Sequence, residues 1–184
     1  MTAIEQVLRT LARKHEGTPY WVLEKDYALG YLLAGMAQIP ILSDSLILKG
    51  GTALRKFYFV DYRFSEDLDF SAVTQFADAD AAMQNAGDVT QTLLLEQGPF
   101  EVSVERLQLR DPHPGGQDGF NVRVRFPSHR EALCRLKVEI THDEEVLLSP
   151  VSRSLLHSLS CSSTCWLALL HARRTCSREV ASAV

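Results

Sequence analysis

The sequence predicts an α+β fold in which helices flank a mixed or antiparallel sheet. Three observations carry this prediction. Apolar residues recur at helical spacing near the N-terminus, an apolar strand leads through a Gly-Gly-Thr turn into a short helix, and alternating strands occupy the second half. The chain has 184 residues, enough for one domain with a sizeable core. We expect this core to span residues 1–150.

Two helices are predicted before the central strand. Over residues 2–16, apolar side chains recur every three or four positions, which places them on one face of a helix, and Gly17 is a natural stop. Residues 19–37 are predicted to form a second, more apolar helix. The segment 38–45, which contains Pro40, is predicted to be a connector.

Three adjacent charges, Glu24, Lys25 and Asp26, interrupt the apolar pattern of the second helix. Such a run is most often a solvated face. The alternative is that some of these side chains brace the loop of an active site. The sequence leaves both interpretations open.

A glycine turn follows a short apolar strand in the centre of the chain. The turn consists of Gly50, Gly51 and Thr52, and a helix is predicted over residues 53–59. A strand–glycine–helix unit can present backbone N–H groups and a helix N-terminus to an anion. The turn is therefore a candidate phosphate-binding site.

A pair of carboxylates begins the next predicted strand. Asp67 and Asp69 are two residues apart, so they lie on one face, while Leu68 and Phe70 point into the core. Two adjacent carboxylates repel each other unless a proton or a cation lies between them. A phosphate-binding turn near such a pair indicates metal-assisted phosphoryl or nucleotidyl transfer.

The second half of the chain is predicted to contain one helix and three strands. The helix spans residues 74–97, and the strands span 100–109, 120–126 and 132–141. A Pro/Gly-rich turn joins the first two strands, which we expect to form a hairpin.

The last of these strands carries Glu139 and Lys137 on one face. Three carboxylates from two neighbouring strands can hold two divalent cations, and a lysine beside them can neutralise phosphate charge. The alternative is an ordinary salt-bridged surface. The Asp67 and Asp69 pair and the upstream glycine turn favour the metal site.

Residues 151–184 differ from the rest of the chain. This tail contains eight serines, three of the four cysteines, four arginines and one acidic residue, so its formal charge is +3 while the whole chain has −4. Its composition is that of a frameshifted or poorly ordered segment. We therefore place a boundary at residue 150 and treat the tail as atypical.

Charge and hydropathy exclude several classes of protein. A net charge of −4 provides no global basic field for nucleic acid, so contact with RNA would need a local patch. The apolar runs are too short to span a membrane, and the acid-containing N-terminus is unlike a signal peptide. We expect a cytoplasmic protein with no membrane partner.

The segments LKGGTALRKFYF, RFSEDLDF and LKVEI, in this order, resemble the AbiEii/AbiGii-type nucleotidyltransferase toxins. This family belongs to the DNA polymerase beta-type nucleotidyltransferase superfamily. The resemblance covers roughly residues 20–142 and includes the EKDY stretch at 24–27. It implies a polymerase beta-like core that moves an NMP from an NTP to an acceptor, with Mg²⁺ or Mn²⁺ as the metal. For some members the acceptor is a tRNA end, and a cognate antitoxin or a role in phage defence is implied.

The resemblance also assigns roles to individual residues. Those implied to bind the nucleotide are Gly50, Gly51, Thr52, Arg63 and Ser65. Those implied to form the catalytic centre are Asp67, Asp69, Glu139 and Lys137, with the three acids as metal ligands.

Two other functions stay open. Family members continue into a helical half that residues 151–184 do not resemble, so we expect a chain truncated at this point. Such a chain would be a catalytically impaired remnant that binds a nucleotide or a protein. A metal-dependent phosphohydrolase is the third candidate, but the sequence shows no His-Asp metal pair of the usual hydrolase kind, and His142, which follows the Glu139 strand, is interpreted as a surface histidine.

Overall fold

The computed structural model describes residues 3–59, 61–74, 77–131, 133–146, 149–153, 155 and 170–172. Its helices are α1 (Ala3–Lys14), α2 (Tyr20–Ala37), α3 (Pro40–Ser45), α4 (Gly50–Phe57) and α5 (Ala79–Leu95). Its strands are β1 (Leu46–Lys49), β2 (Asp67–Ala72), β3 (Glu101–Leu107), β4 (Gln117–Arg125), β5 (Cys134–Thr141), β6 (Val151–Arg153) and β7 (Leu170–Ala172).

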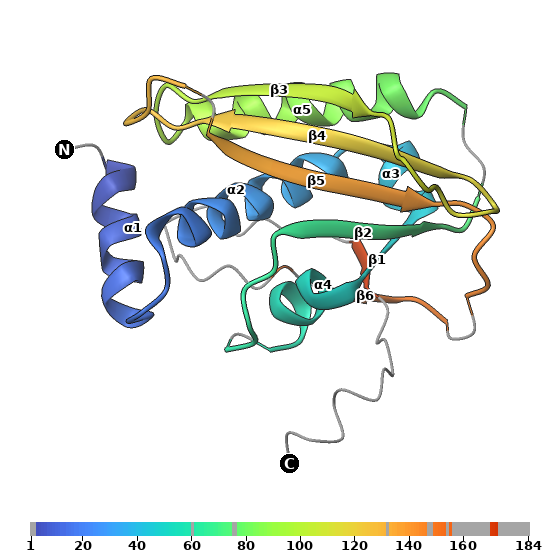
Figure 1. Cartoon of the computed structure of the whole chain (residues 1–184), viewed down its shortest axis with the longest axis horizontal. Coiled ribbons are helices and arrows are strands. Elements are labelled where there is room, and N and C mark those ends of the chain that lie inside the picture. Colours follow the sequence, from blue (N-terminus) through green and yellow to red (C-terminus); the bar gives the residue numbers. More distant parts are fainter. Residues whose placement is uncertain are drawn as a thin grey trace, which may run out of the picture.

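The strands form one mixed sheet in the order β3-β4-β5-β2-β1-β7-β6 (Figure 1). β2 runs parallel to β5, and β1 runs parallel to β7, whereas the other neighbouring strands are antiparallel. The predicted α+β fold with a mixed sheet is confirmed, and so is the predicted β3–β4 hairpin. Two short strands after residue 150 extend the sheet beyond β1.

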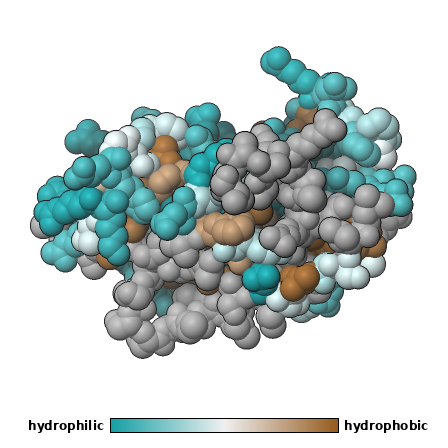
Figure 2. Space-filling view, turned by 90° about the horizontal axis from the view of Figure 1, so that it is seen from below, coloured by the Kyte–Doolittle hydropathy of each residue, from teal (hydrophilic) through white to brown (hydrophobic). Residues whose placement is uncertain are grey.

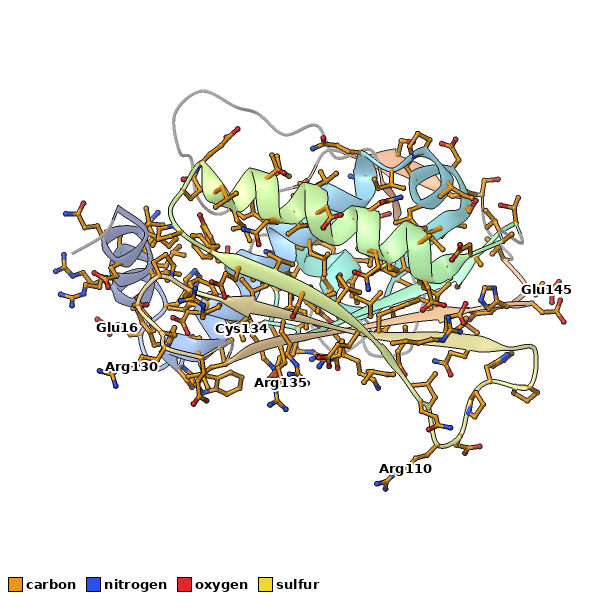
Figure 3. The ribbon with its side chains drawn as sticks, turned by 90° about the horizontal axis from the view of Figure 1, so that it is seen from above. Glu16, Arg110, Arg130, Cys134, Arg135 and Glu145 are labelled. Atoms are coloured by element: carbon orange, nitrogen blue, oxygen red, sulfur yellow. The ribbon has the colours of Figure 1, made fainter. Side chains whose placement is uncertain are left out.

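Helices α2 and α5 cover one face of this sheet (Figures 1 and 3). The apolar side chains of the central strands that pack in the core are Leu68, Phe70, Val138 and Ile140, all fully buried. Arg135 of β5 points away from α5 (Figure 3), as alternation along a strand requires. The polar residues at every second position of β2 and β5 therefore lie on the sheet face opposite α5.

The two covering helices approach each other closely at Gly35. A Cβ atom at this position would lie 2.2 Å from Thr90 Oγ1 and 2.9 Å from the Ala86 carbonyl oxygen of α5. Only glycine leaves room for this contact. The apolar helix predicted over residues 19–37 thus becomes the buried α2 of the molecule.

Several predicted elements differ in their bounds, and three of these differences concern helices α3, α5 and α4. The connector predicted over 38–45 contains α3, in which Pro40 occupies the first turn, a position that needs no backbone donor. The helix predicted from residue 74 begins at Ala79, because the Asp78 side chain caps it by accepting from the Ala81 N–H at 2.9 Å. Gly50 and the two residues after it form the first turn of α4 rather than a separate turn.

Exposed apolar side chains are interspersed with polar ones. Figure 2, which faces the α4 side, shows several separate apolar areas next to polar surface. The large apolar residues with exposed side chains are Tyr20, Trp21, Ile41, Phe59, Val73, Leu95, Leu133 and Val151. Within the part of the chain that the structure describes, no helix has the length and apolar character needed to cross a membrane.

Candidate active site

The register of three central strands brings the predicted acids together. Asp69 of β2 pairs with Lys49 of β1 on one side and with Glu139 of β5 on the other. One step along the same face, Asp67 pairs with Lys137. Four residues from two distant segments, predicted separately from the sequence, therefore occupy adjacent positions on the sheet face opposite α5.

Electrostatic repulsion is built into this group of carboxylates. Burial raises the pKa of Asp69, and the negative charges of Glu139 and Asp67 raise it further, although Lys49 and Lys137 counteract part of the effect. Burial also raises the pKa of Asp67, against the lowering effect of Lys137 and Lys25. A bound cation would relieve this repulsion, so the residues present fit a divalent metal.

The Glu139 carboxylate forms an ion pair with a neighbouring lysine. The Lys137 Nζ lies 3.0 Å from Glu139 Oε1, and this hydrogen bond raises the pKa of Lys137. Among the residues that the structure describes, no three His, Cys, Asp or Glu side chains form a group arranged to hold a metal ion. The metal site stays a prediction, in which Asp67 and Asp69 form the pair and Glu139 would turn from Lys137 to join them.

The start of α4 lies directly against the carboxylates. Gly50 has a φ of +75°, and a Cβ there would lie 2.8 Å from Asp69 Oδ2. A Cβ on Gly51 would lie 3.3 Å from Ser65 Oγ and 3.5 Å from Arg63 Nη2. The predicted phosphate-binding residues and the acidic pair therefore form one continuous site at the positive end of a helix.

Thr52 has a structural task in this arrangement. Its buried hydroxyl donates a hydrogen bond of 2.5 Å to the Asp67 carbonyl oxygen. This bond ties the first turn of α4 to the first residue of β2. What Thr52 contributes here is the relative position of the glycine turn and the carboxylates.

Two charged residues at the site were missed by the sequence analysis. The Lys49 ammonium donates to the Glu144 carboxylate and lies 3.5 Å from Thr141 Oγ1, and Ser71 Oγ donates to Glu144 at 2.5 Å. Lys49 immediately precedes the glycine pair, a position that offered a signal. Glu144 lies in a loop after β5, and nothing in its sequence context indicates that its side chain contacts Lys49 of β1.

One of the three α2 charges, Lys25, contacts the loop before β2, and the other two are buried. Glu24 and Asp26 are buried, and Lys25 Nζ lies 2.6 Å from the carboxylate of Glu66, the residue before Asp67. These side chains are therefore not a solvated face. His142 Nε2, in turn, lies 2.8 Å from Asp118 Oδ2 of β4, a carboxylate outside the predicted metal ligands.

The comparison with protein families decides the relationship of this chain. The model of the nucleotidyl transferase AbiEii toxin, of a type IV toxin–antitoxin system, matches residues 31–169, more than half of the chain. The chain belongs to the AbiEii nucleotidyltransferase toxin family. The resemblance inferred from the motifs is confirmed, and the match extends past the boundary predicted at residue 150.

A solved structure of a nucleotidyltransferase toxin agrees with this assignment. The chain is similar to MenT4, a nucleotidyltransferase toxin from Mycobacterium tuberculosis H37Rv, with a TM-score of 0.56 and 25% sequence identity. The similarity covers 82% of this chain and 48% of MenT4, so the chain spans about half the length of that protein. Comparison with curated proteins finds no match.

Proposed function

We propose that this AbiEii-family chain transfers an NMP from an NTP to an acceptor hydroxyl, with RNA, in particular a tRNA, as the acceptor. The single observation that carries the proposal is the position of Asp69. Its carboxylate lies against Gly50 on one side and pairs in register with Glu139 on the other. A phosphate-binding turn and a cation-binding pair are both needed for nucleotidyl transfer, and here they share one residue.

Each residue of the site has a defined task in this reaction. The backbone of Gly50 and Gly51 and the side chains of Arg63 and Ser65 would hold the triphosphate. Asp67, Asp69 and Glu139 would hold Mg²⁺ or Mn²⁺, which would supply charge stabilisation for in-line attack at the α-phosphate. Lys137, released from Glu139, would offset phosphate charge as pyrophosphate leaves.

The biological setting proposed for the chain follows its family. The family that matches is that of a toxin of a type IV toxin–antitoxin system. We extend this to a cytoplasmic toxin with a cognate antitoxin and a role in phage defence. Expression of this chain in bacterial cells should inhibit their growth, and growth that is never inhibited would argue against the toxin assignment.

Label transfer tests the proposed activity. The purified chain is incubated with Mg²⁺, each α-labelled NTP in turn and total cellular RNA, beside Asp67→Ala. We expect label on RNA with the parent protein and none with the variant, because the variant lacks one member of the cation-binding pair. Label at the same rate with both proteins would contradict the proposal.

A second candidate is a remnant that binds NTP without transferring it. The observation that favours this candidate is that Lys137 Nζ lies 3.0 Å from Glu139 Oε1, and that among the described residues no three carboxylates are arranged to hold a metal ion. Calorimetry with NTP and Mg²⁺, run beside the label-transfer assay, separates the two. Binding without transfer to any acceptor would favour the remnant.

A further inference from the structure

A buried ion cluster joins α2 to α4 below the candidate site. Asp26 of α2 and Arg55 and Lys56 of α4 are 5%, 6% and 3% exposed. Arg55 Nε lies 2.9 Å and Lys56 Nζ 3.0 Å from the same oxygen, Asp26 Oδ1. Two cations thus share one carboxylate in the interior. Charges are rarely buried unless they are paired, so this cluster needs an explanation.

Of the two cations, Arg55 reaches beyond the cluster to the loop before β2. Its Nη1 donates to the Tyr62 carbonyl oxygen, and its guanidinium stacks on the Phe64 ring with Cζ 3.6 Å from the ring centroid. Lys56 instead turns back to α2, where its Nζ donates to the Asp26 carbonyl oxygen at 2.8 Å. The two residues share an anion but differ in what else they hold.

The loop held by Arg55 carries part of the candidate nucleotide site. Residues 62–66 run beside α4 into β2 (Figure 1), and Arg63 and Ser65 of this loop lie against Gly51. Lys25 holds the other end of the loop through Glu66 at 2.6 Å. A shift of this loop would move Arg63 and Ser65 away from the glycine turn.

We propose that Arg55 and Asp26 are positioning residues that set the loop 62–66 against the start of α4, so that the nucleotide site is formed before the nucleotide binds. Asp26 fixes the guanidinium through Nε, and the guanidinium fixes the loop through the Tyr62 carbonyl and the Phe64 ring. A planar guanidinium can do all three at once, whereas an ammonium cannot. The claim that the nucleotide site is pre-formed rests on the proposed function. The claim that Arg55 positions residues 62–66 does not.

The matched pair Arg55→Lys and Lys56→Met tests the inference. Both substitutions change a buried cation that contacts Asp26, but only the first removes the contacts to the loop. Lys56→Met also leaves Asp26 and Arg55 as a neutral pair. The measurements are hydrogen exchange of the backbone amides of residues 62–66, and calorimetric binding of NTP with Mg²⁺.

We expect amide exchange in residues 62–66 to rise at least about tenfold in Arg55→Lys and to stay at the parent level in Lys56→Met. NTP binding should weaken by about tenfold in the first variant only. Equal exchange in both variants, or exchange at the parent level in Arg55→Lys, would overturn the inference. If the parent binds no NTP, the proposed function fails, and the exchange contrast still decides whether Arg55 positions the loop.

A second variant covers the case in which Arg55→Lys does not fold. Phe64→Leu removes the ring under the guanidinium and leaves the three charges of the cluster in place. We expect it to unfold at nearly the parent urea concentration while the amides of residues 62–66 exchange faster. Parent-like exchange in a folded Phe64→Leu would overturn the role of the stacking contact and with it the inference.

Discussion

At the scale of single residues, the protein contains two groups of closely spaced charged side chains. Asp67 and Asp69 both have raised pKa values, mainly because they are partly buried beside other acids. Asp26 shows the opposite behaviour. Burial would raise the pKa of Asp26, but Lys56 and Arg55 outweigh it and hold the pKa below the ordinary value. The β2 carboxylates thus repel each other, whereas the Asp26 carboxylate is paired with two cations of α4.

The substitution Asp26→Asn tests the stabilising effect of the buried cluster. The folded protein holds a proton on Asp26 less tightly than the unfolded chain does, so ionised Asp26 stabilises the fold above its ordinary pKa of 3.8. This contribution is lost as the pH falls from 3.8 through the lowered pKa of the folded state. We expect Asp26→Asn to lower the free energy of unfolding by about 3–5 kcal/mol at neutral pH.

Urea unfolding of the parent and Asp26→Asn across the acid pH range measures this effect. The difference between the two proteins should shrink below pH 3.8, where the carboxyl of the parent also becomes neutral. Asp88→Asn, at an exposed position of α5, serves as the control and should follow the parent. A difference that is constant with pH would contradict the assignment of charge to Asp26.

At the scale of elements, the unit β1–α4–β2 forms the site. The left-handed Gly50 ends β1, opens α4 and leaves room for the Asp69 carboxylate. The chain then returns through residues 62–66 so that Asp67 starts beside Thr52. Each of these steps brings the predicted phosphate-binding turn closer to the predicted cation-binding pair, and both motifs lie within 25 positions of the sequence, from 46 to 70.

The pair Gly50→Ala and Gly17→Ala separates backbone strain from loss of the site. Both glycines have positive φ values, +75° and +85°, but a Cβ on Gly17 meets nothing within 4 Å while one on Gly50 meets Asp69 at 2.8 Å. We expect each substitution to cost about 1–2 kcal/mol of stability from the left-handed conformation.

Only Gly50→Ala should also abolish label transfer, because its new methyl group displaces the Asp69 carboxylate. Thermal unfolding and label transfer, measured side by side on both variants, check this expectation. Transfer retained in Gly50→Ala, or lost equally in Gly17→Ala, would show that the close contact with Asp69 is not needed.

Sequence patterns predicted which side chains share a face within one strand, but not which residues pair between neighbouring strands. Alternation placed Asp67 and Asp69 on one face, and the glycine pair marked the start of α4, because both signals are local. The Asp69–Glu139 register joins segments separated by 70 positions, and no local pattern encodes it. The sequence analysis took the two strands as neighbours from their acidic residues, and the resemblance to the family supported that link. Arg55 was missed because its role depends on a loop that passes over it.

At the scale of the whole molecule, the mixed sheet places the site at the centre of the fold. β2 lies between β1 and β5, so one face of its strand carries the carboxylates and the other carries Phe70 and Leu68 into the core under α2 and α5. The same strand therefore serves both stability and chemistry. A weakened core at this point would loosen the site as well.

Phe70→Ala tests how much this core position under the site contributes to the stability of the fold. Phe70 is fully buried, so its truncation should lower the free energy of unfolding by about 3–5 kcal/mol. Leu133→Ala is the control, because Leu133 is 62% exposed and its truncation should change stability by no more than about 0.5 kcal/mol. Urea denaturation of both variants gives the comparison. Equal losses of stability would contradict the burial of Phe70 at the centre of the sheet.

The central claim is that the carboxylate pair beside the glycine turn performs nucleotidyl transfer. The most direct test is the rate of label transfer from NTP to RNA by the parent and by Asp69→Asn, which preserves shape and removes charge. The raised pKa of Asp69 reflects its burial first and then repulsion from Glu139 and Asp67, and a neutral asparagine carries neither cost. The variant should therefore fold at least as stably as the parent at neutral pH. We predict transfer by the parent and none by the variant. Transfer by a folded Asp69→Asn protein at the parent rate would contradict the claim.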